Sequence, residues 1–144
     1  LLELGADPFI PNVDGCTPLM VAAGLGSRAP EEEAGSLEEC LAVVKFMVGL
    51  GSDVNVVDAN GETAMHGAAY KNAPLVAQYL HEQGADIEIW NRNNNSGWTP
   101  LLIAEGYRPG NFKTSFATVD TITEIMLSQG VKPPTEPRPK PTNY

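Results

Sequence analysis

The sequence predicts an all-α protein built from repeated helix-turn-helix units. The prediction rests on a recurring length, on segments that begin alike and on glycines at matching distances. Gly51 and Gly84 lie 33 positions apart, whereas Gly5 to Gly51 and Gly84 to Gly130 each span 46 positions. A fixed period of this size is typical of stacked repeats that share one continuous core. We therefore expect a 33-residue unit with an insertion in two of its copies.

The units begin alike, with a helix start. Residues 15–23 read GCTPLMVAA, residues 61–69 read GETAMHGAA and residues 97–104 read GWTPLLIA. Thr17 and Thr99 each precede a proline, which places a hydroxyl at the N-cap and the proline in the first turn, where its missing N–H costs nothing. The small helix formers expected to let neighbouring helices approach closely are Ala22, Ala23, Ala68 and Ala69.

Each unit continues into a second helix and ends at a glycine. The apolar positions of these helices are Val43, Val44, Met47 and Val48, then Val76, Tyr79 and Leu80, then Ile122, Ile125, Met126 and Leu127. Ser36 with Glu39 predicts a capping box at the start of the first of them. Gly51, Gly84 and Gly130 follow where a left-handed C-cap is needed. A turn at residues 58–61 then leads to the next unit.

At these residues the sequence resembles the ankyrin repeat family, whose pattern runs G-x-T-P-L-H-x-A-A, a second helix and G-A-D-x-N. The resemblance covers residues 1–131 and implies an ankyrin repeat solenoid with β-turn fingers. It divides the chain into a partial repeat at residues 1–10, repeats at about 11–57, 58–90 and 91–131, and a Pro-rich tail at 132–144. Because the first copy is only half a repeat, we expect the chain to be the C-terminal part of a longer array.

The resemblance also implies structural roles. Thr63 and His66 stand at the threonine and histidine of the pattern, which implies that they tie adjacent turns together by hydrogen bonds. Met20 and Leu102 replace this histidine in the other repeats, so apolar packing must substitute there. Glu105 replaces an alanine of the pattern, and we expect it to pair with Arg108 three positions later.

The insertions and the tail carry weaker signals. Residues 27–36 contain three consecutive glutamates and are expected to form a solvated, dispensable loop. The turn at residues 91–97 is three residues longer than its counterpart and is expected to protrude as a longer finger. Residues 94–96 match the short acceptor motif for N-glycosylation. The PxxP spacing at residues 134–137 suits either a ligand for an aromatic groove or an extended linker.

Composition and motifs exclude several function classes. The chain has 18 acidic and 9 basic residues and a net charge of −9, so its average surface repels nucleic acid. No stretch without a charge is long enough to span a membrane. Cys16 and Cys40 lack the spacing of a zinc site, and no sequence motif of a nucleophile, phosphate loop or metalloprotease is present. We expect no enzyme, no metal and no cofactor.

The resemblance implies protein recognition, because in ankyrin proteins the turn tips and the exposed side of the first helices line a groove. The candidate contact residues carried over to this chain are Asn60, Glu62, Tyr70, Lys71, Trp90, Arg92, Trp98 and Tyr107. Tyrosine, tryptophan and arginine supply much of the binding energy at protein interfaces. Trp98 has a second interpretation, as a cover for the turn that it follows.

We therefore expect a monomeric, non-enzymatic scaffold that binds a protein partner, and a basic partner in view of the acidic surface. The sequence leaves the compartment unknown and favours the cytoplasm. The alternative is a regulatory or structural arm of a larger enzyme or sensor whose catalytic domain lies upstream of this segment. Identification of the full reading frame separates the two.

Overall fold

The computed structural model describes residues 9–25, 36–108 and 114–134. Within these ranges it contains helices and turns but no β-strand, which confirms the predicted all-α class. The helices are α1 (Pro18–Ala23), α2 (Leu37–Gly49), α3 (Ala64–Tyr70), α4 (Pro74–Glu82), α5 (Ile87–Trp90), α6 (Pro100–Ala104) and α7 (Phe116–Ser128). Most of the acidic insertion, residues 27–36, lies outside the described residues, so its expected loop character stays a prediction.

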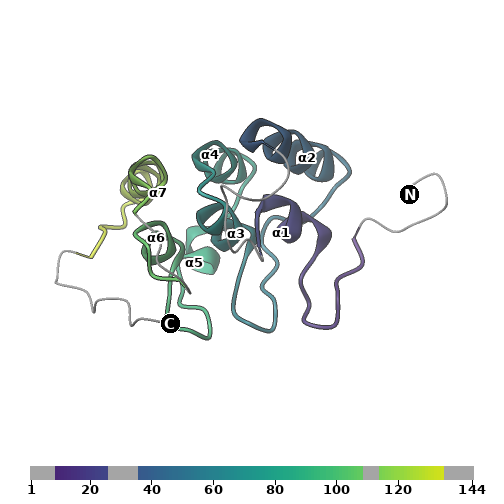
Figure 1. The fold of residues 1–144 in the computed structure, drawn as a ribbon, viewed down its shortest axis with the longest axis horizontal. Helices are drawn as coiled ribbons and strands as arrows, with labels where there is room; N and C mark the ends of the chain where they lie inside the picture. Colours follow the sequence, from purple (N-terminus) through teal and green to yellow (C-terminus); the bar gives the residue numbers. More distant parts are fainter. Residues whose placement is uncertain (1–8, 26–35, 109–113, 135–144) are drawn as a thin grey trace.

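The helices form two layers, with turns projecting from one side (Figure 1). The first layer contains α1, α3 and α6, and the second contains α2, α4 and α7. Within the first layer α1 packs on α3 and α3 on α6, and within the second α2 packs on α4 and α4 on α7. Each first-layer helix also packs on the second-layer helix that follows it in the chain. This is the stacked array of helix pairs that the sequence predicts.

Local signals in the sequence explain where the helices begin. The Thr17 hydroxyl accepts a hydrogen bond from the Met20 N–H, and the Thr99 hydroxyl accepts one from the Leu102 N–H, both at 3.3 Å. Ser36 caps α2 in the same way, accepting from the Glu39 N–H at 3.1 Å. These contacts satisfy N–H groups that have no partner within the helix.

The three second-layer helices end in the same way. Gly51, Gly84 and Gly130 have φ values of 105°, 95° and 76°, a region that L-residues with side chains rarely adopt. In each case the glycine N–H donates to the carbonyl three residues earlier, and the next N–H donates to the carbonyl five residues before itself. This is the Schellman pattern, so the predicted C-caps are confirmed.

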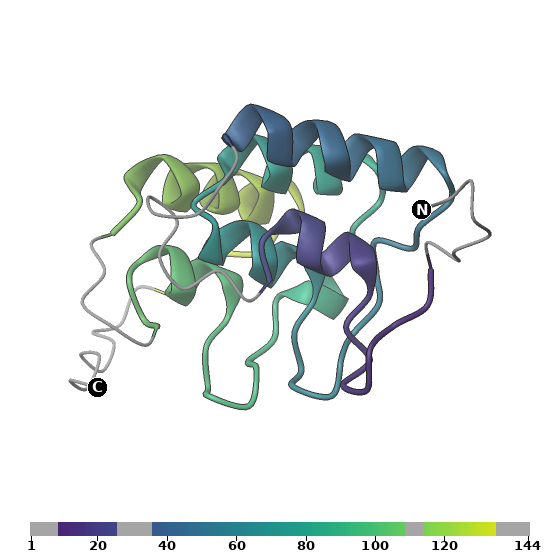
Figure 2. The same ribbon diagram turned by 45° about the vertical axis from the view of Figure 1, so that its right-hand side comes forward.

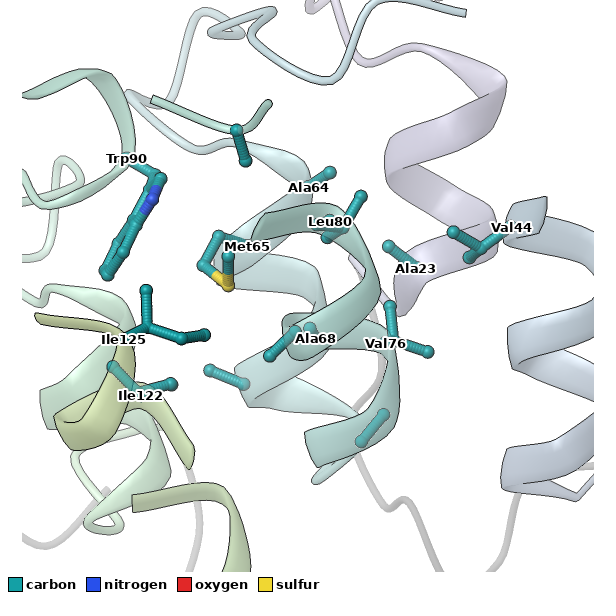
Figure 3. Packing of buried hydrophobic residues seen from close by; sticks show 14 of the residues in the cluster. Ala23, Val44, Ala64, Met65, Ala68, Val76, Leu80, Trp90, Ile122 and Ile125 are labelled. Atoms are coloured by element: carbon teal, nitrogen blue, oxygen red, sulfur yellow. The ribbon is translucent and has the colours of Figure 1, made fainter. Parts of the chain in front are cut away.

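Small side chains hold the two layers together. Ala23, Ala68 and Ala69 are fully buried. Ala23 of α1 lies near Val44 of α2, and larger residues such as Met65 and Leu80 belong to the same core (Figure 3). Ala22, predicted to pack equally well, is only half-buried. The core is continuous from one helix pair to the next, as expected when each pair cannot bury its apolar face alone.

The outer face of α2 departs from the predicted apolar stripe. Val43 and Phe46, eight and five positions before the closing glycine, are 49% and 55% exposed. Their counterparts in α7, Ile122 and Ile125, are buried, because α4 packs on α7 from that side. Val43 was expected within the buried stripe, and that expectation is wrong because its position faces away from α4.

A further helix pair stacked on this face of α2 is expected to stabilise the array. Covering Val43 and Phe46 removes about half of two large side chains from water, worth roughly 2 kcal/mol, and should raise the midpoint of thermal unfolding by several degrees. Calorimetry of the chain with and without an added N-terminal consensus repeat measures this difference. An unchanged midpoint would show that the face gains nothing from being covered.

Candidate functional site

Three turns of identical construction form the edge of the molecule opposite the second helix layer (Figure 2). Each begins with an Asn or Asp whose Oδ1 accepts two backbone N–H groups, two and four residues later, at 2.9 to 3.0 Å. A glycine at positive φ stands three residues after that side chain. We call these turns fingers; they are residues 12–16, 58–62 and 94–98. Their hydrogen bonds fix the fingers without any contribution from the side chains at their tips.

Main-chain hydrogen bonds also join each finger to the next. The Ala59 N–H donates to the Asp14 carbonyl at 2.7 Å, and the Asn95 N–H donates to the Asn60 carbonyl at 2.9 Å. The side-chain amide of Asn95 donates to the Ala59 carbonyl as well, at 3.3 Å. The tips are therefore held side by side in one register.

The third finger does not protrude beyond the others, contrary to the sequence prediction. Its tip has the same five-residue frame as the second finger and is bonded to it in register. The three extra residues lie earlier, between Gly84 and Asn94, where the chain forms the short helix α5. Asp86 caps α5 by accepting the Glu88 N–H at 2.9 Å. The insertion thus changes what lies beneath the finger and leaves its length unchanged.

A polar cluster joins the second and third fingers to the end of α3. The Asn94 amide donates to Glu62 Oε2 at 3.1 Å and to the Tyr70 hydroxyl at 3.3 Å, and the Tyr70 hydroxyl bonds the Glu62 carboxylate. The Arg108 guanidinium lies over the Tyr70 ring, 5.2 Å from its centroid, and is only 2% exposed. The expected pairing of Arg108 with Glu105 stays a prediction.

Burial dominates the electrostatics of this cluster. It raises the pKa of Glu62, although the hydrogen bonds from Asn94 and Tyr70 oppose that shift. Burial, assisted by the negative charge of Glu62, raises the pKa of the Tyr70 hydroxyl well above its usual value, so that it remains a donor at neutral pH. The cluster therefore holds one half-buried carboxylate that is hydrogen-bonded by a phenol and an amide, and a guanidinium lies over the ring of that phenol.

Further carboxylates lie beside the second finger. Burial raises the pKa of the Cys16 thiol, and the negative charges of Asp58, Glu62 and Asp14 raise it further. Asp14, Asp58 and Glu62 thus place three carboxylates near the Cys16 thiol, which stays protonated at neutral pH.

His66 links its own repeat to the next finger, as the resemblance implied. Its Nε2 lies 3.1 Å from the Arg92 carbonyl, and its Nδ1 lies 3.1 Å from the Thr63 N–H. Because a carbonyl can only accept, Nε2 carries the proton and Nδ1 accepts. Burial lowers the pKa of His66 to about 4, so the ring is neutral at physiological pH. Met20, its counterpart in the first helix pair, is buried instead.

Two predicted contact residues lie in the interior, and the prediction that they face a partner is wrong. Trp90 is 1% exposed, and its indole lies beside Met65 and Ile125 (Figure 3). Lys71 is 8% exposed, because α1 ends against it: a Cβ atom added to Gly24 would lie 2.5 Å from the Lys71 Cβ. Its ammonium acts on the half-buried Cys40 thiol, where it opposes the rise in pKa that burial causes.

The other predicted contact residues retain exposed surface. Asn60 and Arg92 are exposed, and the side-chain Nε of Arg92 donates to the Glu88 carbonyl at 2.7 Å. Glu62, Tyr70, Trp98 and Tyr107 are half-buried. Trp98 ends the third finger and packs against the core as well, so both interpretations of it agree with its position.

Sequence analysis missed Asn94 as the centre of the polar cluster. The motif Asx-x-x-Gly, which starts at Asn12, Asp58 and Asn94, would have revealed it, because it aligns the fingers directly. The possible glycosylation motif has a different explanation. Asn94 is buried, and both ends of its side-chain amide are engaged in hydrogen bonds, so the folded chain does not offer it to a modifying enzyme.

No group of three or more His, Cys, Asp or Glu side chains that could hold a metal ion occurs in residues 9–25, 36–108 and 114–134. Over the same ranges, none of the helices has the length and apolar character needed to cross a bilayer. The site is therefore described by its hydrogen bonds, its aromatic rings and its negative charge.

Comparison with known proteins identifies the array. A family model described as "Ankyrin repeats (3 copies)" matches residues 33–114, more than half of the chain. The chain belongs to the ankyrin repeat family. Ankyrin repeats generally mediate protein–protein interaction, and the family is generally non-catalytic.

Several larger proteins contain similar ankyrin repeats. The chain is 38% identical over 110 residues to neurogenic locus notch homolog protein 1 from Homo sapiens and from Mus musculus, an alignment that covers 71% of this chain and 4% of each relative. It is 36% identical over 76 residues to the potassium channel AKT1 from Arabidopsis thaliana, covering 53% of this chain and 8% of the channel. The chain therefore spans a small fraction of the length of these relatives.

Proposed function

We propose that this ankyrin array binds a protein partner, without catalysis, on the surface formed by the three fingers and the Tyr70 polar cluster. We call this surface the finger face. The observation that carries the proposal is the register of the fingers: hydrogen bonds between main-chain atoms hold the three tips side by side. A surface that is rigid before binding loses little conformational entropy when a partner docks.

The side chains of the finger face suit recognition. Glu62, Tyr70 and Trp98 are half-buried, so their rotamers are already restricted while part of each remains open to a partner. Tyr107 is half-buried as well and directly precedes Arg108, whose guanidinium lies over the Tyr70 ring. Asn60 is exposed at the tip of the second finger and offers an amide that can both donate and accept. Arg92 is exposed beside the third finger. Trp90 and Lys71 take no part, because they are buried.

The expected partner is basic. Asp14, Asp58 and Glu62 concentrate negative charge near the second finger, and the whole chain carries a net charge of −9. Charges of one sign on an interface accelerate association with a partner of opposite sign and make it sensitive to salt.

Substitutions on the finger face should weaken partner binding selectively. Trp98→Ala with Tyr107→Ala is expected to reduce affinity at least tenfold, since large aromatic side chains dominate interface energies. Asp14→Asn should slow association and reduce its dependence on salt, because Asp14 is exposed and its side chain can lose its charge without a buried contact being broken. Biolayer interferometry with a captured partner at several salt concentrations measures both effects.

A matched control lies on the other helix layer. Leu75 of α4 is 62% exposed and remote from the fingers, so Leu75→Ala should leave affinity unchanged. If Leu75→Ala weakens binding and the finger variants do not, the partner uses the second helix layer and the finger face has been misassigned.

A second role is that of a regulatory or structural arm within a larger protein. The supporting observation is that this chain spans 4% to 8% of the notch and channel relatives, whose ankyrin repeats occur in much longer proteins. The full reading frame tests this role, because a catalytic or sensor domain in the same chain favours the arm and a chain of repeats alone favours the scaffold.

A further inference from the structure

The tip of the second finger carries an asparagine that is followed directly by a glycine. Asn60 is the one asparagine in the sequence that precedes a glycine. Asparagine side chains are chemically labile, because the backbone nitrogen of the next residue can attack the side-chain amide carbon. Glycine has no Cβ, so its nitrogen reaches that carbon with the least steric hindrance. Of the asparagines in the chain, Asn60 therefore has the most reactive neighbour.

The side chain of Asn60 is also free to react. It is exposed, and within the part of the chain that the structure describes its amide makes no hydrogen bond. The other finger asparagines are engaged: the side chains of Asn12 and Asn94 accept backbone N–H groups, and that of Asn95 donates to the Ala59 carbonyl at 3.3 Å. Asn60 can therefore turn its side chain towards the next nitrogen without first losing a hydrogen bond.

The main chain at this tip sets the rate. The Gly61 N–H donates to the Asp58 carbonyl at 3.1 Å, and the Asn60 carbonyl accepts the Asn95 N–H at 2.9 Å. The Gly61 nitrogen cannot attack while it is held in this way. Exposed turns open locally at a free energy far below that of global unfolding. The reaction therefore proceeds from the opened tip, more slowly than in an unfolded chain.

We propose that Asn60 is a site of spontaneous deamidation on the finger face. The Gly61 nitrogen attacks Cγ of Asn60 and forms a new C–N bond. The bond between Cγ and Nδ2 breaks, and the amide leaves as ammonia, which takes up the proton of the Gly61 nitrogen. The product is a five-membered succinimide ring, and the only further reactant is water.

Water opens the ring at one of two bonds. Cleavage between the nitrogen and Cγ leaves an ordinary aspartate. Cleavage between the nitrogen and the main-chain carbonyl carbon leaves isoaspartate, in which the main chain runs through Cβ and Cγ and the former carbonyl becomes a free carboxylate. Either product places a new negative charge at the tip of the second finger.

The two products change the finger face differently. Aspartate keeps the main chain and adds charge next to Asp58, whose Oδ1 accepts the Asn60 N–H at 2.9 Å. Isoaspartate lengthens the main chain by one methylene and moves the acceptor of the Asn95 N–H off the main chain, so the bond between the second and third fingers is displaced. The chemistry does not depend on partner binding, whereas an effect on a partner rests on the proposed function.

Incubation of the full chain in mildly alkaline buffer at physiological temperature, followed by peptide mapping with mass spectrometry, tests the proposal. Asn60 should be converted before any other asparagine, and part of the product should be methylated by a protein isoaspartyl methyltransferase. A parallel sample in urea should react faster, because the Gly61 N–H is released there. Conversion in urea without conversion in the folded chain, or earlier conversion of another asparagine, would overturn the proposal.

Two variants remove and add the reaction. Asn60→Gln should abolish conversion at this tip, because glutamine closes a larger ring much more slowly. Asp14 occupies the equivalent place in the first finger, and Gly15 follows it with its N–H bonded to the Asn12 carbonyl at 3.0 Å. Asp14→Asn therefore creates a second pair of the same kind and should gain the reaction. Absence of conversion at position 14 would show that the finger turn does not permit it.

The Asn95 amide resonance reports the structural effect. It should shift in the incubated wild-type chain and stay unchanged in the incubated Asn60→Gln variant, because the Asn60 carbonyl is its acceptor. An unshifted resonance in fully converted protein would overturn the expected displacement between the fingers. Failure of the conversion itself would leave the finger face proposal untouched, since partner binding does not require the reaction.

Discussion

Trp90→Ala is expected to lower the free energy of unfolding by about 4 kcal/mol, the cost typical of truncating a buried tryptophan. The indole is 1% exposed and lies beside Met65 of one helix pair and Ile125 of the next, so its removal opens a cavity where the two pairs meet. Urea denaturation followed by circular dichroism measures the loss. A variant that unfolds at the wild-type midpoint would mean that Trp90 is not a core residue.

Trp90→Phe is the matched control. Phenylalanine keeps most of the apolar volume and removes an indole N–H that has no hydrogen-bond partner among the described residues. The loss should therefore be about 1 kcal/mol, well below that of the alanine variant. An equally large loss for phenylalanine would show that the indole N–H is engaged after all.

Acidification from pH 6.5 to pH 4 should destabilise the fold through His66, by about 3 kcal/mol in total. The pKa of the ring falls from 6.5 to about 4 on folding, mainly because the ring is buried. The unfolded chain therefore binds a proton in this window while the folded protein does not. The contribution is fully present above pH 6.5 and is lost as the pH falls towards 4. Urea denaturation at half-unit intervals of pH measures it.

His66→Met isolates this contribution, because methionine occupies the same position in the first helix pair. The variant loses the hydrogen bond to the Arg92 carbonyl at every pH, but its stability should fall less between pH 6.5 and 4 than that of the wild type. The comparison is needed because Glu62, whose pKa burial raises, gains its proton earlier in the folded protein and acts in the opposite direction. Parallel curves for the two proteins would exclude His66 as the source.

The helices and their ends could be predicted from the sequence because their causes are local. The helix caps at Thr17, Thr99 and the closing glycines act on backbone groups within a few residues. Each cap can therefore be predicted without knowledge of the rest of the chain. The repeat pattern then supplied the stacking, because equivalent helices meet equivalent neighbours. Even the link between His66 and the next finger followed from the resemblance.

The positions of Trp90 and the polar cluster depend on longer-range facts. Trp90 follows Gly84 at the same distance as Val57 follows Gly51, and Val57 is exposed. Trp90 precedes the third finger at the same distance as Val54 precedes the second, and Val54 packs on the core. The three-residue insertion makes the two counts differ, and the structure follows the second. The bond between Asn94 and Glu62 joins residues 32 positions apart, which no local pattern indicates.

The hydrogen bonds between the fingers separate the atoms that the chain must keep in order to fold from the side chains that it can vary in order to bind a partner. The contacts that hold the tips in register are made mainly by main-chain atoms of Asp14, Ala59, Asn60 and Asn95, and these atoms are common to almost any residue. Val13, at the first tip, is 99% exposed and touches almost nothing. The tips can therefore exchange side chains at little cost in stability, so one frame could be retuned for new partners by a handful of substitutions, in evolution or in design.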